Sequence, residues 1–141
     1  MTIRAIIDGK GHEVISVGSD AKVSEAVAFF AERRIGAVPV IDGGKVVGIF
    51  SERDVIYSLA KNGPAALDAR VGDVMTRPAL TVEPGQHVIA ALSLMTRRRV
   101  RHLPVVEDGA VIGFVSIGDL VKYRIDKIES EAAALREYIS S

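Results

Sequence analysis

The sequence has no cysteine and no tryptophan among its 141 residues, and aromatic side chains make up only 5% of it. Without cysteine there is no disulfide, no thiolate nucleophile and no thiolate metal ligand. The three histidines, His12, His87 and His102, are separated in sequence, which disfavours a metal centre. No apolar run approaches the roughly 20 residues that a transmembrane helix needs. We therefore expect a soluble, globular protein without a metal site.

An excess of charge of one sign is also lacking, because 18 Lys and Arg residues balance 18 Asp and Glu residues. A neutral chain has no overall field that would draw it to nucleic acid or to an acidic membrane. Residues 1–13 reach glycine and charge too soon to form the apolar segment of a secretion signal. We therefore expect a cytoplasmic location, with neither nucleic acid nor a membrane as partner.

What the sequence does contain is an internal repeat. Residues 15–59 can be laid on residues 80–124 without a gap, at a constant offset of 65. Several matched positions carry proline, glycine or polar residues, which match by chance less often than aliphatic ones do. These pairs are Pro39 with Pro104, Gly44 with Gly109, Gly48 with Gly113, Ser51 with Ser116, and Asp54 with Asp119. The pattern indicates a duplication.

Each copy has the same pattern of predicted elements. A short β-branched strand (14–17; 80–82) precedes an apolar stripe with helical spacing, which begins at Val23 or Val88. Two apolar runs joined by a glycine turn then predict a hairpin, and a second helix opens at Ser51 or Ser116. The fold class is therefore α/β, with two β-α-β-β-α units and residues 61–78 as the connector. The expected division is 1–64, 65–125 and a C-terminal helix extension over 126–141.

The two units are expected to pack together. A unit of about 60 residues buries only about 60% of its unfolded surface and is marginal alone. Homologous units would pack about a pseudo-twofold axis, which brings equivalent loops together around two related clefts.

A serine followed three residues later by an aspartate occurs where a strand runs into a helix in both copies, at Ser51 and Asp54 and at Ser116 and Asp119. One interpretation is a helix cap that needs no ligand. The other is a binding site, because a helix N-terminus attracts anions and a carboxylate accepts hydrogen bonds from the two hydroxyls of a ribose. Occurrence at both predicted clefts favours the ligand.

The segments before the two Pro-Val strands differ between the copies. The small pair Gly36 and Ala37 would let a flat ring approach the backbone, whereas Arg101 and His102 offer a phosphate fork and a titratable donor. A tight connection and a solvated histidine are the alternatives. Arg101 belongs to the basic cluster 97–101. We interpret the cluster as a solvated helix end, from which Arg101 alone contacts a ligand. The alternative is a patch that binds nucleic acid.

The last helix carries an apolar seam with alternating spacings of 4 and 3. Its members are Val121, Ile125, Ile128, Ala132, Leu135 and Ile139. The seam continues past the end of the repeat, so we expect a homodimer rather than a helix folded onto its own domain. Phosphate-loop, dinucleotide-binding and His-Glu-x-x-His motifs are missing from the sequence, and the protein is not expected to be an enzyme.

These residues resemble a known family, the tandem cystathionine-β-synthase (CBS) domain pair, also called a Bateman module. The resemblance rests on Val38-Pro39-Val40 and Leu103-Pro104-Val105, on the two Gly-x-x-Ser-x-x-Asp segments, and on Val74-Met75-Thr76. It implies binding of an adenosine-containing ligand between the two units, with AMP first and ADP, ATP, NAD(H) or S-adenosylmethionine as alternatives. It also implies a non-catalytic regulatory module with an unidentified regulated protein.

The resemblance also implies which residues form each cleft. Asp54 and Asp119 resemble the ribose-binding aspartates, with Arg53 and Gly118 at the variable place between serine and aspartate. One cleft would comprise Ile15, Ile35, Gly36, Ala37, Arg101, Ser116, Gly118 and Asp119. The other would comprise Ser51, Arg53, Asp54, Leu80, Val100, Arg101 and His102. A purely structural dimerisation module and a nucleic-acid binder are the alternative functions.

Overall fold

The structure is a computed structural model that describes residues 1–140. The first part of the chain forms α1 (Ile3–Lys10), α2 (Val23–Arg33), β1 (Ala37–Asp42), β2 (Lys45–Ser51), α3 (Glu52–Asn62), the 3-10 helix η1 (Gly63–Asp68) and α4 (Val71–Val74). The second part forms α5 (Val88–Arg98), β3 (His102–Glu107), β4 (Ala110–Ser116) and α6 (Ile117–Ser140). The predicted C-terminal helix includes residue 141, which lies outside the described residues.

The duplication is visible in the geometry of the two units. The bounds of α2, β1 and β2 lie 65 positions before those of α5, β3 and β4. Both strand pairs are antiparallel and share one register, with Ala37 opposite Ser51 and His102 opposite Ser116. Arg34 and Arg99 end α2 and α5 in the same left-handed conformation. The predicted α/β fold with two equivalent units is therefore confirmed.

Both predicted hairpins are present with two-residue turns. The turn residues Gly43 and Gly44 have φ of 57° and 80°, and Asp108 and Gly109 have φ of 53° and 81°. The tight turns that are favoured between twisted antiparallel strands require a positive φ at both central positions. The glycines and the aspartate of the sequence therefore determine where each hairpin reverses.

The prediction of an opening strand in each unit, over 14–17 and 80–82, is wrong in extent. Only Val17, bridged to Val40, and Val82, bridged to Val105, pair in parallel with a neighbouring strand. After Val17 the chain turns, and the backbone N–H and the hydroxyl of Ser19 both donate to the carboxylate of Asp42. After Val82 comes Pro84, which has no N–H to donate. These features end the pairing on the C-terminal side of each bridge, and residues 14–16 and 80–81 form no ladder with a neighbouring strand.

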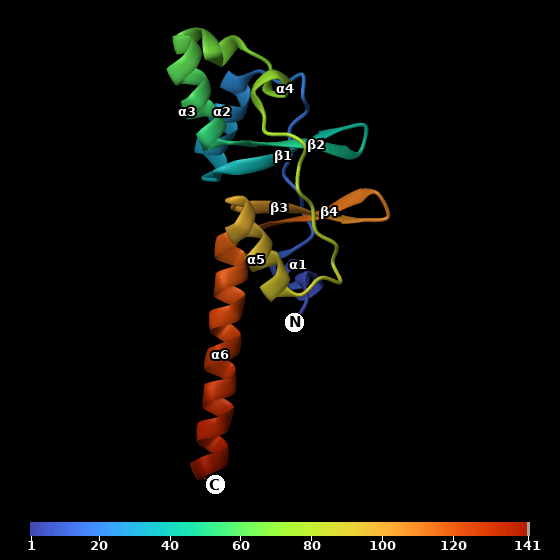
Figure 1. Cartoon of the computed structure of the whole chain (residues 1–141), viewed down its shortest axis with the longest axis vertical. Helices are drawn as coiled ribbons and strands as arrows, with labels where there is room; N and C mark the ends of the chain where they lie inside the picture. Colours follow the sequence, from blue (N-terminus) through green and yellow to red (C-terminus); the bar gives the residue numbers. More distant parts are fainter. Residues whose placement is uncertain (141) are drawn as a thin grey trace.

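The two units lie one above the other, with the hairpins β1–β2 and β3–β4 facing each other at the middle of the molecule (Figure 1). Each unit has its own core. The first buries side chains of α2, β1, β2 and α4, and the second those of α1, α5, β3, β4 and the start of α6.

The sequence analysis did not predict α1, whose Ile3, Ile6 and Ile7 are buried in the second core. The predicted connector 61–78 contains η1 and α4, and its residues Leu67 and Val71 pack on the first core.

One glycine in each hairpin allows a segment from outside the hairpin to lie against the sheet. These two crossing segments are residues 75–79, which lead into the second unit, and helix α1. A Cβ on Gly48 would lie 2.6 Å from Met75 Sδ and 2.8 Å from the carbonyl oxygen of Thr76. A Cβ on Gly113 would lie 2.7 Å from Cγ2 of Ile7. The segment that enters the second unit therefore packs on the first, and the N-terminal helix packs on the second. As a result, the hydroxyl of Thr76 contacts Asp54, and the ammonium of Lys10 contacts Asp119.

Helix α6 extends well beyond the second unit (Figure 1). In the described chain, residues 1–140, no helix combines the length and the apolar character needed to span a bilayer. No group of three or more His, Cys, Asp or Glu side chains within the same residues is arranged to hold a metal ion.

Candidate functional site

A cavity of about 620 Å³ is lined by residues of both units. From the first unit it takes Gly36, Ile49, Ser51, Glu52, Arg53, Asp54, Ile56 and Tyr57, and from the crossing segment Thr76, Pro78 and Ala79. From the second unit it takes Leu80, Arg98, Arg99, Val100, Arg101 and His102. Every residue predicted for the Asp54 cleft is in this set. Gly36, which was predicted for the other cleft, also lies here.

Asp54 lies at the start of α3 and is held by three hydrogen bonds. The backbone N–H and the hydroxyl of Ser51 donate to its Oδ2, at 2.9 and 3.1 Å, and the hydroxyl of Thr76 donates to its Oδ1 at 2.9 Å. The Asp54 N–H donates back to Ser51 Oγ at 3.4 Å, which completes a capping box. An ionised carboxylate has about four acceptor positions. The cap and an additional donor from a ligand are therefore compatible.

Four arginines line the same cavity: Arg53, Arg98, Arg99 and Arg101. No ion pair joins any of them to an acidic group within residues 1–140. A guanidinium presents five N–H donors in a planar fork that matches phosphate oxygens. Glu52 and Asp54 are the acidic residues in the lining, so the cavity has more positive than negative side chains. The arrangement suits an anionic ligand that also carries hydroxyl groups.

His102 adds a flat, half-buried surface to the cavity. Its ring stacks on the ring of Phe114, with centroids 5.5 Å apart and 12° between the planes. Burial lowers the pKa of His102, and the nearby charges of Lys10 and Arg101 lower it further, against the opposing effect of Asp119. The imidazole is therefore neutral at pH 7, with one nitrogen as donor and the other as acceptor.

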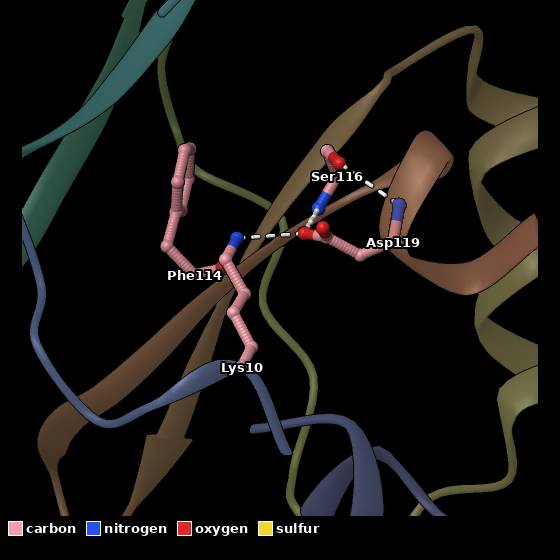
Figure 2. Close-up of polar contacts among 4 residues, drawn as sticks. All are labelled: Lys10, Phe114, Ser116 and Asp119. Atoms are coloured by element: carbon pink, nitrogen blue, oxygen red, sulfur yellow. Dashed lines mark hydrogen bonds and ion pairs between the residues drawn. The ribbon is translucent and has the colours of Figure 1, made fainter. Parts of the chain in front are cut away.

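The equivalent carboxylate, Asp119, is in a different environment. The Ser116 N–H donates to its Oδ2 at 2.8 Å, and its own N–H donates to Ser116 Oγ at 3.1 Å. The ammonium of Lys10 also donates to Oδ2, at 2.6 Å, and to the carbonyl oxygen of Phe114 at 2.8 Å (Figure 2). Burial raises the pKa of Asp119, but the hydrogen bonds from Lys10 and Ser116 outweigh it, so that the pKa lies below its usual value.

The other residues predicted for the Asp119 cleft do not line the 620 Å³ cavity. Ile15 and Ile35 pack against the first core, and Ala37 is buried at the start of β1. Ser116 and Gly118 flank the start of α6 beside Asp119. The structure thus brings together the predicted Asp54 cleft, whereas a cation from the chain already contacts Asp119.

Several lining residues were missed by the sequence analysis. Arg98 and Arg99 stood in the basic cluster but were assigned to the solvated surface, although they lie only three and two positions before Arg101, which was assigned to the ligand. Thr76 was noted only as part of a motif. Tyr57 and Ile56 lie on the exposed side of α3 and gave no signal in the sequence.

Comparisons with known proteins agree on one family. The family model described as CBS domain matches twice, over residues 10–61 and 71–126. The mitochondrial CBS domain-containing protein CBSX3 of Arabidopsis thaliana is 36% identical over 126 residues. That alignment covers 86% of this chain and 61% of the relative, so this chain spans less than two thirds of the length of that protein.

Solved structures show the same fold. The CBS-domain protein ATU1752 from Agrobacterium tumefaciens superposes with a TM-score of 0.84 at 38% identity, over 88% of this chain and 99% of that one. The CBS domain pair of protein MJ0100 superposes with a TM-score of 0.79 at 25% identity, over 90% of this chain and 98% of that one. The MJ0100 structure is a complex with 5′-methylthioadenosine and S-adenosyl-L-methionine.

Proposed function

Since this chain belongs to the CBS domain family, with two copies of the domain in tandem, we propose that it is a non-catalytic regulatory module that binds an adenine nucleotide in the Asp54 cavity. The observation that supports this most strongly is the composition of that cavity. One capped carboxylate with a remaining acceptor position lies in the same 620 Å³ space as four arginines that have no acidic partner.

In this proposal Asp54 accepts hydrogen bonds from the ribose hydroxyls, and the arginines bind the phosphate. Val100 and Leu80 provide apolar contact for the base, and Gly36 leaves room for it because it has no side chain. His102 offers one donor and one acceptor to the edge of the purine. Each of these groups complements one part of a nucleotide, and none of them is arranged as a nucleophile with an activating base.

We propose AMP as the first ligand, with ADP, ATP and NAD(H) as further candidates. All of these carry phosphate, which the arginines would bind. S-adenosylmethionine, one of the ligands in the MJ0100 structure, is also an adenosine compound. Its sulfonium is cationic, so the four arginines of this cavity disfavour it here.

We also propose that the chain forms a homodimer through α6 and works in the cytoplasm on a partner that the ligand regulates. Val121, Ile125 and Ile128 of the predicted seam are between 42% and 49% exposed. An exposed apolar stripe on a helix is stabilised by a partner that covers it. A bound ligand can change such an assembly only by its different affinities for two arrangements of it.

The test is a thermal-shift panel of AMP, ADP, ATP, NADH, GMP and S-adenosylmethionine, followed by calorimetric titration of those that stabilise. A ligand present at about 100 times its dissociation constant stabilises by roughly 2.7 kcal/mol, enough for a shift of several degrees. The Asp54→Asn variant should lose binding, whereas Asp119→Asn, the same change at the equivalent cap, should retain it. A panel with no adenosine-dependent shift contradicts the proposal.

A further inference from the structure

The two crossing segments bring different chemistry to the two equivalent aspartates. The segment before the second unit brings the neutral hydroxyl of Thr76 to Asp54. The segment before the first unit brings the ammonium of Lys10 to Asp119. The two segments differ in structure, because Thr76 bridges Ile49 of β2, whereas Lys10 is the last residue of α1. The two equivalent aspartates therefore have different partners, one neutral and one charged.

Lys10 makes two contacts in the second unit, one of them with Asp119. Its ammonium bridges the carboxylate of Asp119 and the carbonyl oxygen of Phe114, as Figure 2 shows. The side chain of Asp119 is only 27% exposed and that of Lys10 is 43% exposed. Charged hydrogen bonds are stronger when they are partly shielded from water. The Lys10 ammonium and the Ser116 N–H therefore take both acceptor positions of Asp119 Oδ2, one of the two oxygens that a ribose would contact.

The position of Lys10 is fixed by the fold of α1. Ile3 and Ile7, on the buried face of this helix, are fully inaccessible in the second core. Arg4 makes a further ion pair with Glu107 at the other end of the second hairpin. Lys10 is the last residue of α1, so anchoring of the helix directs its side chain toward Asp119. A ligand at Asp119 would have to displace this tethered cation.

We infer that Lys10 acts as an internal competitor for ligand at Asp119, so that each chain binds one nucleotide, at Asp54. This inference rests on the proposed function and adds to it the number of sites and the residue that sets it. Asp54 accepts hydrogen bonds from Ser51 and from the neutral hydroxyl of Thr76, and its Oδ1 keeps an acceptor position for ribose. A ribose that bonds to Oδ2 of Asp119 requires release of Lys10, which couples binding there to freeing the end of α1.

The experiment is calorimetric titration of the full chain with AMP, and with ATP in a parallel series. The wild-type protein should bind one equivalent per chain. Lys10→Met, which keeps an apolar stem of similar length and removes the charge, should bind a second equivalent. Lys10→Gln should do the same, so that one poorly folding variant does not decide the result. Adding Asp119→Asn to Lys10→Met should return the number to one.

Two control variants separate the ammonium from other effects. Lys10→Arg retains a cation and should still bind one equivalent. Arg4→Met removes the other ion pair between α1 and the second unit without touching Asp119, and should also bind one. Two equal equivalents in the wild type, or one equivalent in both Lys10→Met and Lys10→Gln, overturns the inference while leaving the proposed function intact. No binding by any of these proteins contradicts the proposed function itself.

Discussion

At the residue scale, the pair formed by Lys10 and Asp119 makes part of the stability depend on pH. The pKa of Asp119 lies below its usual value of 3.8, so the folded state favours the ionised carboxylate. The pair therefore stabilises the protein above pH 3.8, and this contribution is lost as the pH falls through the lowered pKa of the folded state. His102 also lies within electrostatic range of this pair, and Ser116 donates to the carboxylate.

Removal of the cation should reverse this effect. In Lys10→Met, the pKa of Asp119 should rise relative to the wild type, because burial then acts with less opposition. Carbon-13 NMR titration of the Asp119 carboxyl measures this directly. The same substitution should lower the free energy of unfolding at pH 7 by about 0.5–1 kcal/mol, as for a partly exposed pair. An Asp119 pKa that is the same in both proteins would contradict the assigned ion pair.

A second residue-scale prediction concerns the phosphate. Arg101→Ala should weaken AMP binding about tenfold to hundredfold, because a charged hydrogen bond contributes about 1.5–3 kcal/mol. The unfolding free energy should change little, since Arg101 is exposed and has no acidic partner in the described chain. Arg136→Ala, on the far part of α6, is the matched control and should bind normally. Equal affinities for the two variants would remove Arg101 from the site.

The resemblance to the CBS family implied the set of residues at the Asp54 cleft, whereas Ser51 and Asp54 were also indicated by a local pattern that occurs in both units. A serine and an aspartate after a strand specify a helix cap wherever the helix lies. The contact of Lys10 with Asp119 joins residues 109 positions apart, and no local pattern encodes it. The same holds for Thr76 at Asp54, which depends on the path of the crossing segment.

At the element scale, the close fit of β2 against the crossing segment can be tested with one methyl group. Gly48→Ala places a Cβ 2.8 Å from the carbonyl oxygen of Thr76, which is backbone and can move only with the whole segment. The substitution should cost about 1–3 kcal/mol of unfolding free energy. Gly9→Ala, in α1 with nothing within 4 Å of the new Cβ, should be neutral or slightly stabilising. Urea denaturation compares the two, and equal stabilities would contradict the close approach.

The proposed dimer is also a property of one element. Ile128→Lys on α6 should convert the dimer to a monomer, because it places a charge in the exposed apolar seam. Glu129→Lys, at the next position and outside the seam, should leave the mass unchanged. Light scattering measures both. A monomeric wild-type protein would contradict self-association, and an unchanged mass in Ile128→Lys would place the interface elsewhere.

Helices and hairpins were predictable where a sequence pattern extends over many residues or includes specific turn residues. The apolar stripes of α2 and α5 and the turn residues of both hairpins are local patterns of this kind. Helix α1 has eight residues, and its apolar face of Ile3, Ile6 and Ile7 gains stability from packing on β4 and α6, far along the chain. The prediction of the opening strands was wrong in extent, because only one residue in each unit pairs with a neighbouring strand.

At the scale of the whole molecule, the competing interpretation is a nucleic-acid surface. The arginines that would form it line a cavity shared by the two units, together with Asp54 and Glu52. We therefore expect a labelled single-stranded RNA to bind weakly or not at all at 150 mM salt, and AMP binding to depend only modestly on salt. Fluorescence anisotropy measures the first. Tight RNA binding with a steep salt dependence that Arg98→Glu abolishes would favour the alternative.

The central claim is that an adenine nucleotide binds between the two units at Asp54. Its most direct test is an NMR titration of the nitrogen-15-labelled chain with AMP, followed at each backbone amide. We expect the amides of Ser51, Asp54, Thr76 and Val100 to shift together and to saturate at one equivalent, while those of Lys10 and Asp119 stay in place. Shifts that begin at Lys10 and Asp119, or a spectrum unchanged by AMP and by ATP, would contradict it.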